Sequence, residues 1–275
     1  MKRTVLFSAA MAFVAAVATS AQATTFFVDQ FNYADGELTV YDGSGADVSG
    51  GLWSPHSGTG FPVPIFVDSG QAVVESGNPA SEDANRSAGT TIALGETWYY
   101  GALVTVVDER ADTATSLNND YFMHFRGSTG GFIGRAYVDD PNVADPTKFT
   151  FGLSATSGGQ VAKWTTDLDF GTQYKIMVSY AVDTGETNLW VDPVDISSTS
   201  INDTSASAML AAIDTLALRQ DFSTGGGDYQ VLVDAVAIGD SFADVMTDVM
   251  IPEPASAVLA LLGLAAVVGS RRRVA

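Results

Sequence analysis

The chain has 275 residues, of which 46% are hydrophobic, and it contains no cysteine. This composition is too apolar for a disordered chain, and the length suffices for one large domain held by its core rather than by disulfides. Thirteen Lys and Arg face 32 Asp and Glu, which gives a net charge of −19. Nucleic acid needs a basic face, so we expect no nucleic-acid partner.

The first 23 residues have the three parts of a secretory signal peptide. A basic start at Lys2 and Arg3 precedes an apolar run over 5–17 and the tripeptide AQA at 21–23, which has the small-x-small pattern of a cleavage site. We therefore expect signal peptidase to remove this segment and the exported chain to begin at Thr24. A retained N-terminal membrane anchor is the alternative.

Residues 24–245 are expected to form one all-β domain. No stretch keeps a helical period, whereas short alternating or aromatic-rich segments are separated by clusters of Gly, Asp, Asn, Ser and Pro. Ten such segments are expected to be strands, at 24–31, 71–76, 97–107, 121–127, 131–138, 148–155, 173–182, 187–192, 215–220 and 229–239. This spacing predicts a two-sheet antiparallel sandwich. One or two helical turns are expected at 205–214, on the edge of the sandwich.

The clearest element is a hairpin over 173–192. Alternate residues from Tyr174 to Val182 are apolar and share one strand face. The turn over 183–186 contains Gly185, which suits a positive φ. After the turn, Leu189 and its alternate neighbours continue the same apolar face.

This hairpin, the strand at 225–239 and the start at 26–36 resemble the concanavalin A-like lectin/glucanase sandwich. The resemblance is closest to the laminin-G-like jelly rolls of secreted bacterial proteins. It implies that the first and last strands lie side by side, which would bring residues 27–31 near 231–238.

The C-terminus carries three signals in order. They are Pro252-Glu253-Pro254, an apolar run over 255–269, and the arginines Arg271, Arg272 and Arg273. We expect residues 246–251 to be a linker and 255–270 a short transmembrane helix, with the arginines in the cytoplasm and the body outside. An ordinary single-pass anchor is one interpretation of this pattern.

The same tail, residues 252–275, resembles the PEP-CTERM sorting signal of exopolysaccharide-producing Gram-negative bacteria. The resemblance implies recognition by an exosortase, a membrane-embedded transpeptidase-like enzyme that removes the tail near the Pro-Glu-Pro motif. The chain would then be held at the inner membrane only transiently. Its final location would be the cell surface or the extracellular matrix.

No catalytic residues are predicted. Sugar hydrolysis on this fold needs two carboxylates about 5 to 10 Å apart across a cleft, and the alternating Glu-x-Asp-x-Glu string is missing. Two histidines, His56 and His124, are too few for a specific triad or metal site. We expect His124 to be a half-exposed structural residue and His56 to make a loop hydrogen bond.

A structural calcium ion is one possible cofactor, because calcium takes oxygen ligands from acidic loops. Candidate ligands are Asp29 and Asp234 at the seam of the first and last strands, and Asp139, Asp140 and Asp145 in one loop. Neither group follows the EF-hand spacing.

Exposed tryptophans stack on sugar rings, and Trp53 and Trp190 are candidates for such a site. Trp190 falls on the strand face opposite Leu189, with Asn188 nearby. Trp98 begins an alternating strand and is expected in the core.

The sequence therefore predicts a non-enzymatic, exported surface or matrix protein handled by an exosortase, with extracellular polysaccharide as a possible partner. A calcium-dependent carbohydrate-binding module is the alternative. A divergent glycoside hydrolase or polysaccharide lyase is the third interpretation.

Overall fold

The computed structural model describes residues 24–40, 47–57, 63–76, 81–113, 115–127, 131–156, 159–205, 212–220 and 228–249. The expected signal peptide, the sorting tail and most of the expected helix at 205–214 lie outside these residues. Within the described ranges, no helix is long and apolar enough to cross a membrane.

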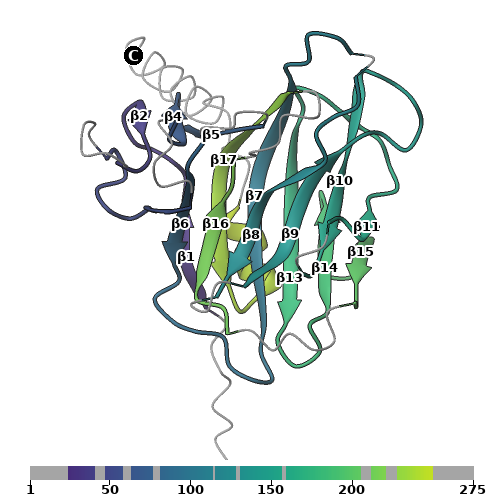
Figure 1. Ribbon diagram of the computed structural model, residues 1–275. Coiled ribbons are helices and arrows are strands. Elements are labelled where there is room, and N and C mark those ends of the chain that lie inside the picture. The colour runs from purple at the N-terminus through teal and green to yellow at the C-terminus, as the bar shows by residue number, and fades with distance from the viewer. Residues whose placement is uncertain are drawn as a thin grey trace, which may run out of the picture.

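Two antiparallel sheets form a jelly-roll sandwich (Figure 1). Sheet A runs β15 (Ser200–Asp203), β14 (Thr187–Val191), β13 (Gln173–Ala181), β7 (Thr97–Asp108), β17 (Tyr229–Gly239), β5 (Gln71–Glu75), β4 (Phe66–Asp68) and β2 (Gly36–Glu37), and β1 (Thr25–Asp29) also pairs with β17. Sheet B runs β11 (Ala162–Lys163), β10 (Lys148–Ser154), β9 (Phe132–Asp139), β8 (Asp120–Arg126), β16 (Thr215–Leu218), β6 (Asp83–Ser87) and β3 (Ser54–Ser57), and β12 (Leu168–Asp169) also pairs with β10.

All ten expected strands are present, and the predicted fold class is confirmed. The hairpin of β13 and β14 pairs Ile176 with Val191 and Tyr180 with Thr187, and Gly185 in its turn has φ 70°. Its apolar face enters the main core between the sheets, as the alternation predicted.

The first and last strands also lie side by side. Strand β1 pairs antiparallel with β17 from Thr25, opposite Gly239, to Asp29, opposite Val236. The seam that the fold resemblance implied is therefore present.

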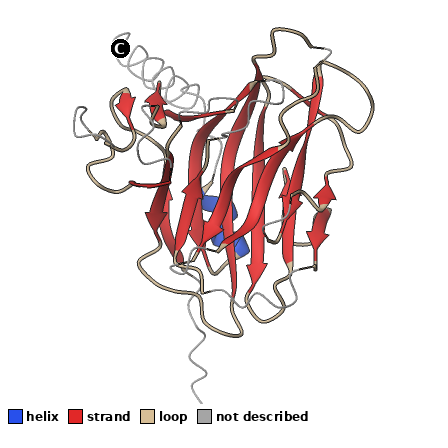
Figure 2. Ribbon diagram, viewed as in Figure 1, coloured by secondary structure: helices blue, strands red, loops and turns tan. Residues whose placement is uncertain are grey.

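The outer face of sheet A is covered by the single described helix, α1 (Phe242–Asp248), which lies behind the strands in Figure 2. Ser241 caps it, because its side chain accepts a hydrogen bond from the Asp244 amide. Phe242 and Val245 pack on Trp190 and Met177 in a second hydrophobic cluster. The linker expected at 246–251 is thus helical in its first three residues.

Candidate functional site: a polar cluster on sheet B

The outer face of sheet B carries an unusual group of side chains, which we call the polar cluster. Strand alternation sends Phe125, Ile133 and Ala136 into the core, so their polar neighbours face away from it. Two register shifts between β8 and β9, one with the extra residue in β8 at 121–123 and one with the extra residue in β9 at 133–136, adjust which residues point outward. The cluster consists of His56, Asn85, Tyr121, His124, Arg126, Phe132, Arg135, Tyr137 and Arg219.

Tyr121 stands at one end of the polar cluster and joins two of its arginines. The guanidinium carbons of Arg135 and Arg219 lie 4.4 and 4.1 Å from the centre of its ring. The rings of His124 and Tyr137 lie 5.4 and 5.6 Å away. Side chains from three neighbouring strands, β8, β9 and β16 with its extension, therefore meet at this point.

The two histidines lie together in the middle of the cluster. Their ring centres are 5.9 Å apart, and Phe132 contacts both, at 4.8 Å from His124 and 5.7 Å from His56. Burial, with a smaller contribution from Arg126, lowers the pKa of His56 to about 4. Burial also lowers the pKa of His124 well below its ordinary value. Both rings are therefore neutral at physiological pH.

The tautomer of His124 follows from its hydrogen bond. Its Nδ1 lies 2.9 Å from the carbonyl oxygen of Phe125, which can only accept, so Nδ1 carries the proton. Nε2 then holds the lone pair of a neutral imidazole, and this atom has no hydrogen-bond partner among the described residues.

The three arginines of the cluster differ in whether a carboxylate neutralises their charge. Arg219 pairs with Asp120 at 2.6 Å. Arg126 contacts the amide oxygen of Asn85 at 3.2 Å, with that amide oriented to donate to Ser54. No described carboxylate lies within 4.0 Å of Arg126 or Arg135. An arginine held below the surface without an anion is costly, so these two side chains are set apart from Arg219.

Several buried polar atoms of the cluster also lack partners among the described residues. They are Nε2 of His56, Nε2 of His124, Nε of Arg126, Nε of Arg135 and the hydroxyl oxygen of Tyr137. Buried polar groups are nearly always hydrogen-bonded, so unpaired atoms gathered at one place need an explanation. Neutral imidazole, hydroxyl and guanidinium groups on one face of a sheet can together bind acidic groups and move a proton beside them.

The residues expected to stack on sugars do not form a site. Trp53 is 1% exposed, and its Nε1 donates to Asp29 at 2.8 Å within the core. Trp190 is 5% exposed, because Phe242 of α1 packs on it at 5.1 Å. The expectation that Trp190 is exposed is therefore wrong. Asn188 contacts Ser179 and Glu186 instead, each at 3.3 Å.

The candidate calcium ligands at the seam of β1 and β17 are occupied by protein groups. Asp29 accepts from Tyr33, Trp53 and Arg86, and Asp234 accepts from Gln173.

The loop aspartates are occupied in the same way. Asp139 pairs with Lys163 at 3.1 Å, Asp140 accepts from the Leu117 amide, and Asp145 accepts from Thr147. No described group of three or more His, Asp or Glu side chains is arranged to hold a metal ion.

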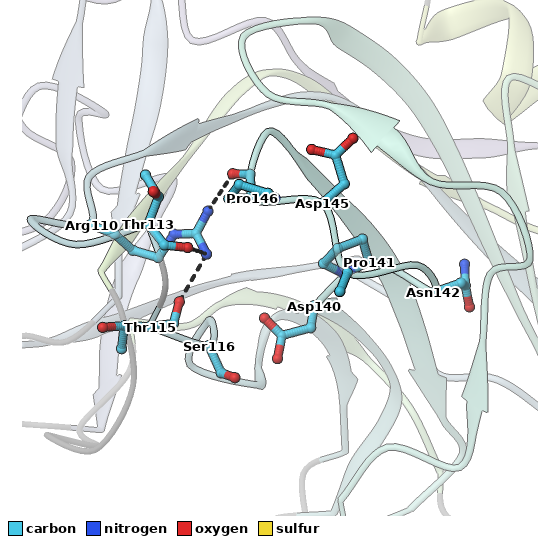
Figure 3. Close-up of a pocket in the computed structure, with 10 residues that line it drawn as sticks. Arg110, Thr113, Thr115, Ser116, Asp140, Pro141, Asn142, Asp145 and Pro146 are labelled. Atoms are coloured by element: carbon cyan, nitrogen blue, oxygen red, sulfur yellow. Dashed lines mark hydrogen bonds between the residues drawn. The ribbon is translucent and has the colours of Figure 1, made fainter.

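A hollow of about 610 Å³ lies between the loops at 110–116 and 140–146 (Figure 3). Arg110 holds these loops together, because it donates to the carbonyls of Thr115 and Pro146 and also binds both carboxylate oxygens of Asp108. The N–H donors of Arg110 are thus already bound to acceptors of the protein itself. The hollow is lined by carboxylates and hydroxyls and Arg110 is already paired, so the polar cluster is the stronger site for an anionic ligand.

Sequence reasoning missed the polar cluster. His124 is fully buried rather than half-exposed, and the cluster's arginines were not singled out. The alternation of residues along β8 and β9 did indicate the cluster. His124 and Arg126 share a face of β8, and Arg135 and Tyr137 share a face of the next strand.

No family model and no curated protein matches the chain. Among solved structures, alginate lyase A1-II′, a member of polysaccharide lyase family 7, is similar at 9% identity and a TM-score of 0.44, over 65% of this chain and 84% of that one. The carbohydrate recognition domain of Emp47p is similar at 10% identity and a TM-score of 0.43, over 80% and 97%. The CBM2 module of the evolved Dit of Lactobacillus casei BL23 phage J-1 has the same two values, over 79% and 96%.

These neighbours are jelly-roll β-sandwich proteins, in keeping with the observed fold. The expectation of a non-enzymatic matrix protein is corrected to this extent: polysaccharide lyases stand among the proteins with a similar sandwich. A likeness this distant transfers neither a substrate nor a residue role.

Proposed function

We propose that this chain cleaves an acidic polysaccharide by β-elimination at the polar cluster. The observation that carries the proposal is the gathering of Arg126, Arg135 and Arg219 around two neutral histidines, in a chain whose net charge is −19. The body from residue 24 to 250 holds five arginines, and three of them stand in this cluster. An acidic protein gains nothing in solubility from such placement, whereas an anionic ligand gains binding energy.

Each group in the cluster suits one part of the reaction. Elimination at a uronate begins with removal of the proton on C5, which becomes acidic when the neighbouring carboxylate is neutralised. Arg135 supplies that positive charge. Nε2 of His124 carries the lone pair that takes the proton. The electron pair left on C5 forms the C4–C5 double bond as the bond from C4 to the glycosidic oxygen breaks.

The leaving oxygen then takes a proton from the hydroxyl of Tyr137. Burial raises the pKa of this tyrosine against the opposing effect of Arg135, so the hydroxyl stays protonated until the leaving group needs it. Tyr137 is 2% exposed and the ring of His124 is fully buried, and the half-buried Phe132 lies 4.8 Å from the His124 ring.

The test is to incubate the purified protein with alginate, polygalacturonate and hyaluronan and follow the ultraviolet absorbance of the unsaturated uronate product. Tyr137→Phe removes only the hydroxyl, so we expect about a 100-fold loss of rate or more. Thermal unfolding of the variant, measured alongside, separates a loss of rate from a loss of the fold. Tyr174→Phe is the matched control, since Tyr174 lies on β13 of the other sheet and should leave the rate unchanged.

Two results would overturn the proposal. One is a lack of unsaturated product from every acidic polymer in the panel. The other is a product whose rate is the same in the wild type and in Tyr137→Phe.

We also propose that the protein is exported and sorted through its C-terminus. The signal-peptide pattern at 1–23 and the PEP-CTERM-like tail at 252–275 support this proposal, and both lie outside the described residues. Intact mass measurement of the protein from its own cells should give a chain that starts at Thr24 and ends near Pro254. A full-length mass would contradict it.

A further inference from the structure

The arginines of the polar cluster stand at two separate levels of sheet B. Arg126 is paired with Phe132, three residues before Arg135 on the neighbouring strand. At the rise of a β-strand, this places their backbones roughly 10 Å apart along the strand direction. Arg219, whose amide donates to the Phe122 carbonyl, is level with Tyr121 and stacks on the same ring as Arg135.

The two levels differ in their surroundings. Arg126 has the Asn85 amide beside it, and its charge acts on His56. Arg135 lies on Tyr121 and Phe132 and faces Tyr137, and Asp120 pairs with the neighbouring Arg219. Each level therefore keeps one guanidinium without a described carboxylate partner.

The space between the two levels holds neutral groups. His56 and His124 are uncharged, and Phe132 contacts both. Asp83 lies 3.9 Å from His56, at the β6 side of the cluster. Positive charge is therefore concentrated at the two ends and absent from the middle.

We propose that the polar cluster has two oxyanion subsites, one at Arg126 and one at Arg135. They bind acidic groups on different sugar units of the same polymer chain. A guanidinium binds a carboxylate or a sulfate through two parallel N–H donors, so each of the two arginines can hold one acidic group. The inference rests on the proposed function for the polymer's being an acidic polysaccharide. It adds that recognition requires at least two acidic groups.

The experiment measures binding of the full chain to galacturonate, to tetragalacturonate and to neutral maltotetraose by calorimetry. Two linked subsites raise affinity well beyond that of one, so the tetramer should bind about 100-fold more tightly than the monomer, and maltotetraose should not bind. Arg126→Gln and Arg135→Gln should each reduce this tetramer preference to about tenfold or less. Lys148→Gln removes one exposed cation from β10 of the same sheet and should leave the preference unchanged. A sulfated oligosaccharide arm distinguishes sulfate from carboxylate as the preferred oxyanion.

Thermal unfolding without ligand separates a binding role from a structural one. Arg126 and Arg135 have no described carboxylate partner, so their Gln variants lose only ring and amide contacts and should still unfold cooperatively, with a small change in unfolding temperature. The tetramer should raise the unfolding temperature of the wild type more than that of either variant.

Failure of this inference and failure of the proposed function are distinguishable. Tight tetramer binding without any unsaturated product would retain the two subsites and remove the lyase. Cleavage by a protein that binds monomer and tetramer equally, or that is indifferent to Arg126→Gln, would retain the lyase and overturn the second subsite.

Discussion

Two buried histidines make the folded state sensitive to acid. His56 has a pKa of about 4 in the folded chain, against about 6.5 when unfolded, and the pKa of His124 is lowered too. Both rings must stay neutral in the folded state, whereas the unfolded chain takes up protons below pH 6.5. Stability is therefore fully present above that pH and is lost as the pH falls toward 4.

For His56 alone, this difference in pKa corresponds to about 3 kcal/mol. Denaturant unfolding at pH 7 and pH 4.5 measures the loss, and His56→Gln should reduce it. An equally steep loss in the variant would show that other groups cause the acid sensitivity.

Glu82 is a second buried ionisable residue, and its effect has the opposite sign. It is 0% exposed, Thr39 donates to one of its carboxylate oxygens, and the other has no partner within the described ranges. Burial raises its pKa, so the folded state loses stability as the pH rises through the range between the unfolded and folded values. Glu82→Gln should therefore stabilise the protein at pH 7 by about 1–3 kcal/mol. The exposed control Glu96→Gln should not, and a destabilised Glu82→Gln would contradict the argument.

At the scale of elements, α1 protects the outer face of sheet A. Phe242 packs on Trp190 at 5.1 Å and on Tyr99 at 5.7 Å. Phe242→Ala should cost about 3 kcal/mol in unfolding free energy and shift tryptophan emission to longer wavelength as water reaches Trp190. Val143→Ala, at a residue 70% exposed, should change stability by less than about 0.5 kcal/mol. Unchanged emission in the first variant would mean that α1 does not shield this ring.

The long strands were predictable because each alternates over five or more residues, as β13 does from Tyr174 to Val182. The short strands were not, since β3 reads SPHS and β6 reads DANRS, with a proline in one and charged residues in both faces of the other. These two strands bring His56 and Asn85 to the polar cluster. Two of its nine residues therefore come from strands held by pairing, β3 on β6 and β6 on β16, which no local pattern reveals.

Trp190 shows the same limit on the other sheet. Its place opposite Leu189 was predicted correctly, yet its exposure depended on α1, which begins more than fifty residues later. The alternation of a strand identifies its two faces. The alternation does not show which part of the chain covers the second face of the strand.

At the scale of the whole molecule, the net charge of −19 opposes the local charge of the polar cluster. An acidic oligosaccharide is repelled at long range and attracted only close to the arginines. Salt shortens the screening length from about 30 Å at 0.01 M to about 8 Å at 0.15 M, so it removes the distant repulsion first. The association rate of tetragalacturonate should therefore rise over this range of salt. A neutral oligosaccharide that shows the same rise, or an acidic one that binds more slowly, would contradict this view.

The pairing of β1 with β17 also determines how the sandwich responds to pulling. Thr25 lies opposite Gly239, and the Asp240 amide donates to the carbonyl of Thr24, so both ends of the domain leave at one corner. A load applied between these ends would break the hydrogen bonds of the β1–β17 ladder one after another. Mechanical force would thus detach β1 long before it could shear the long β7–β17 ladder at the centre of sheet A.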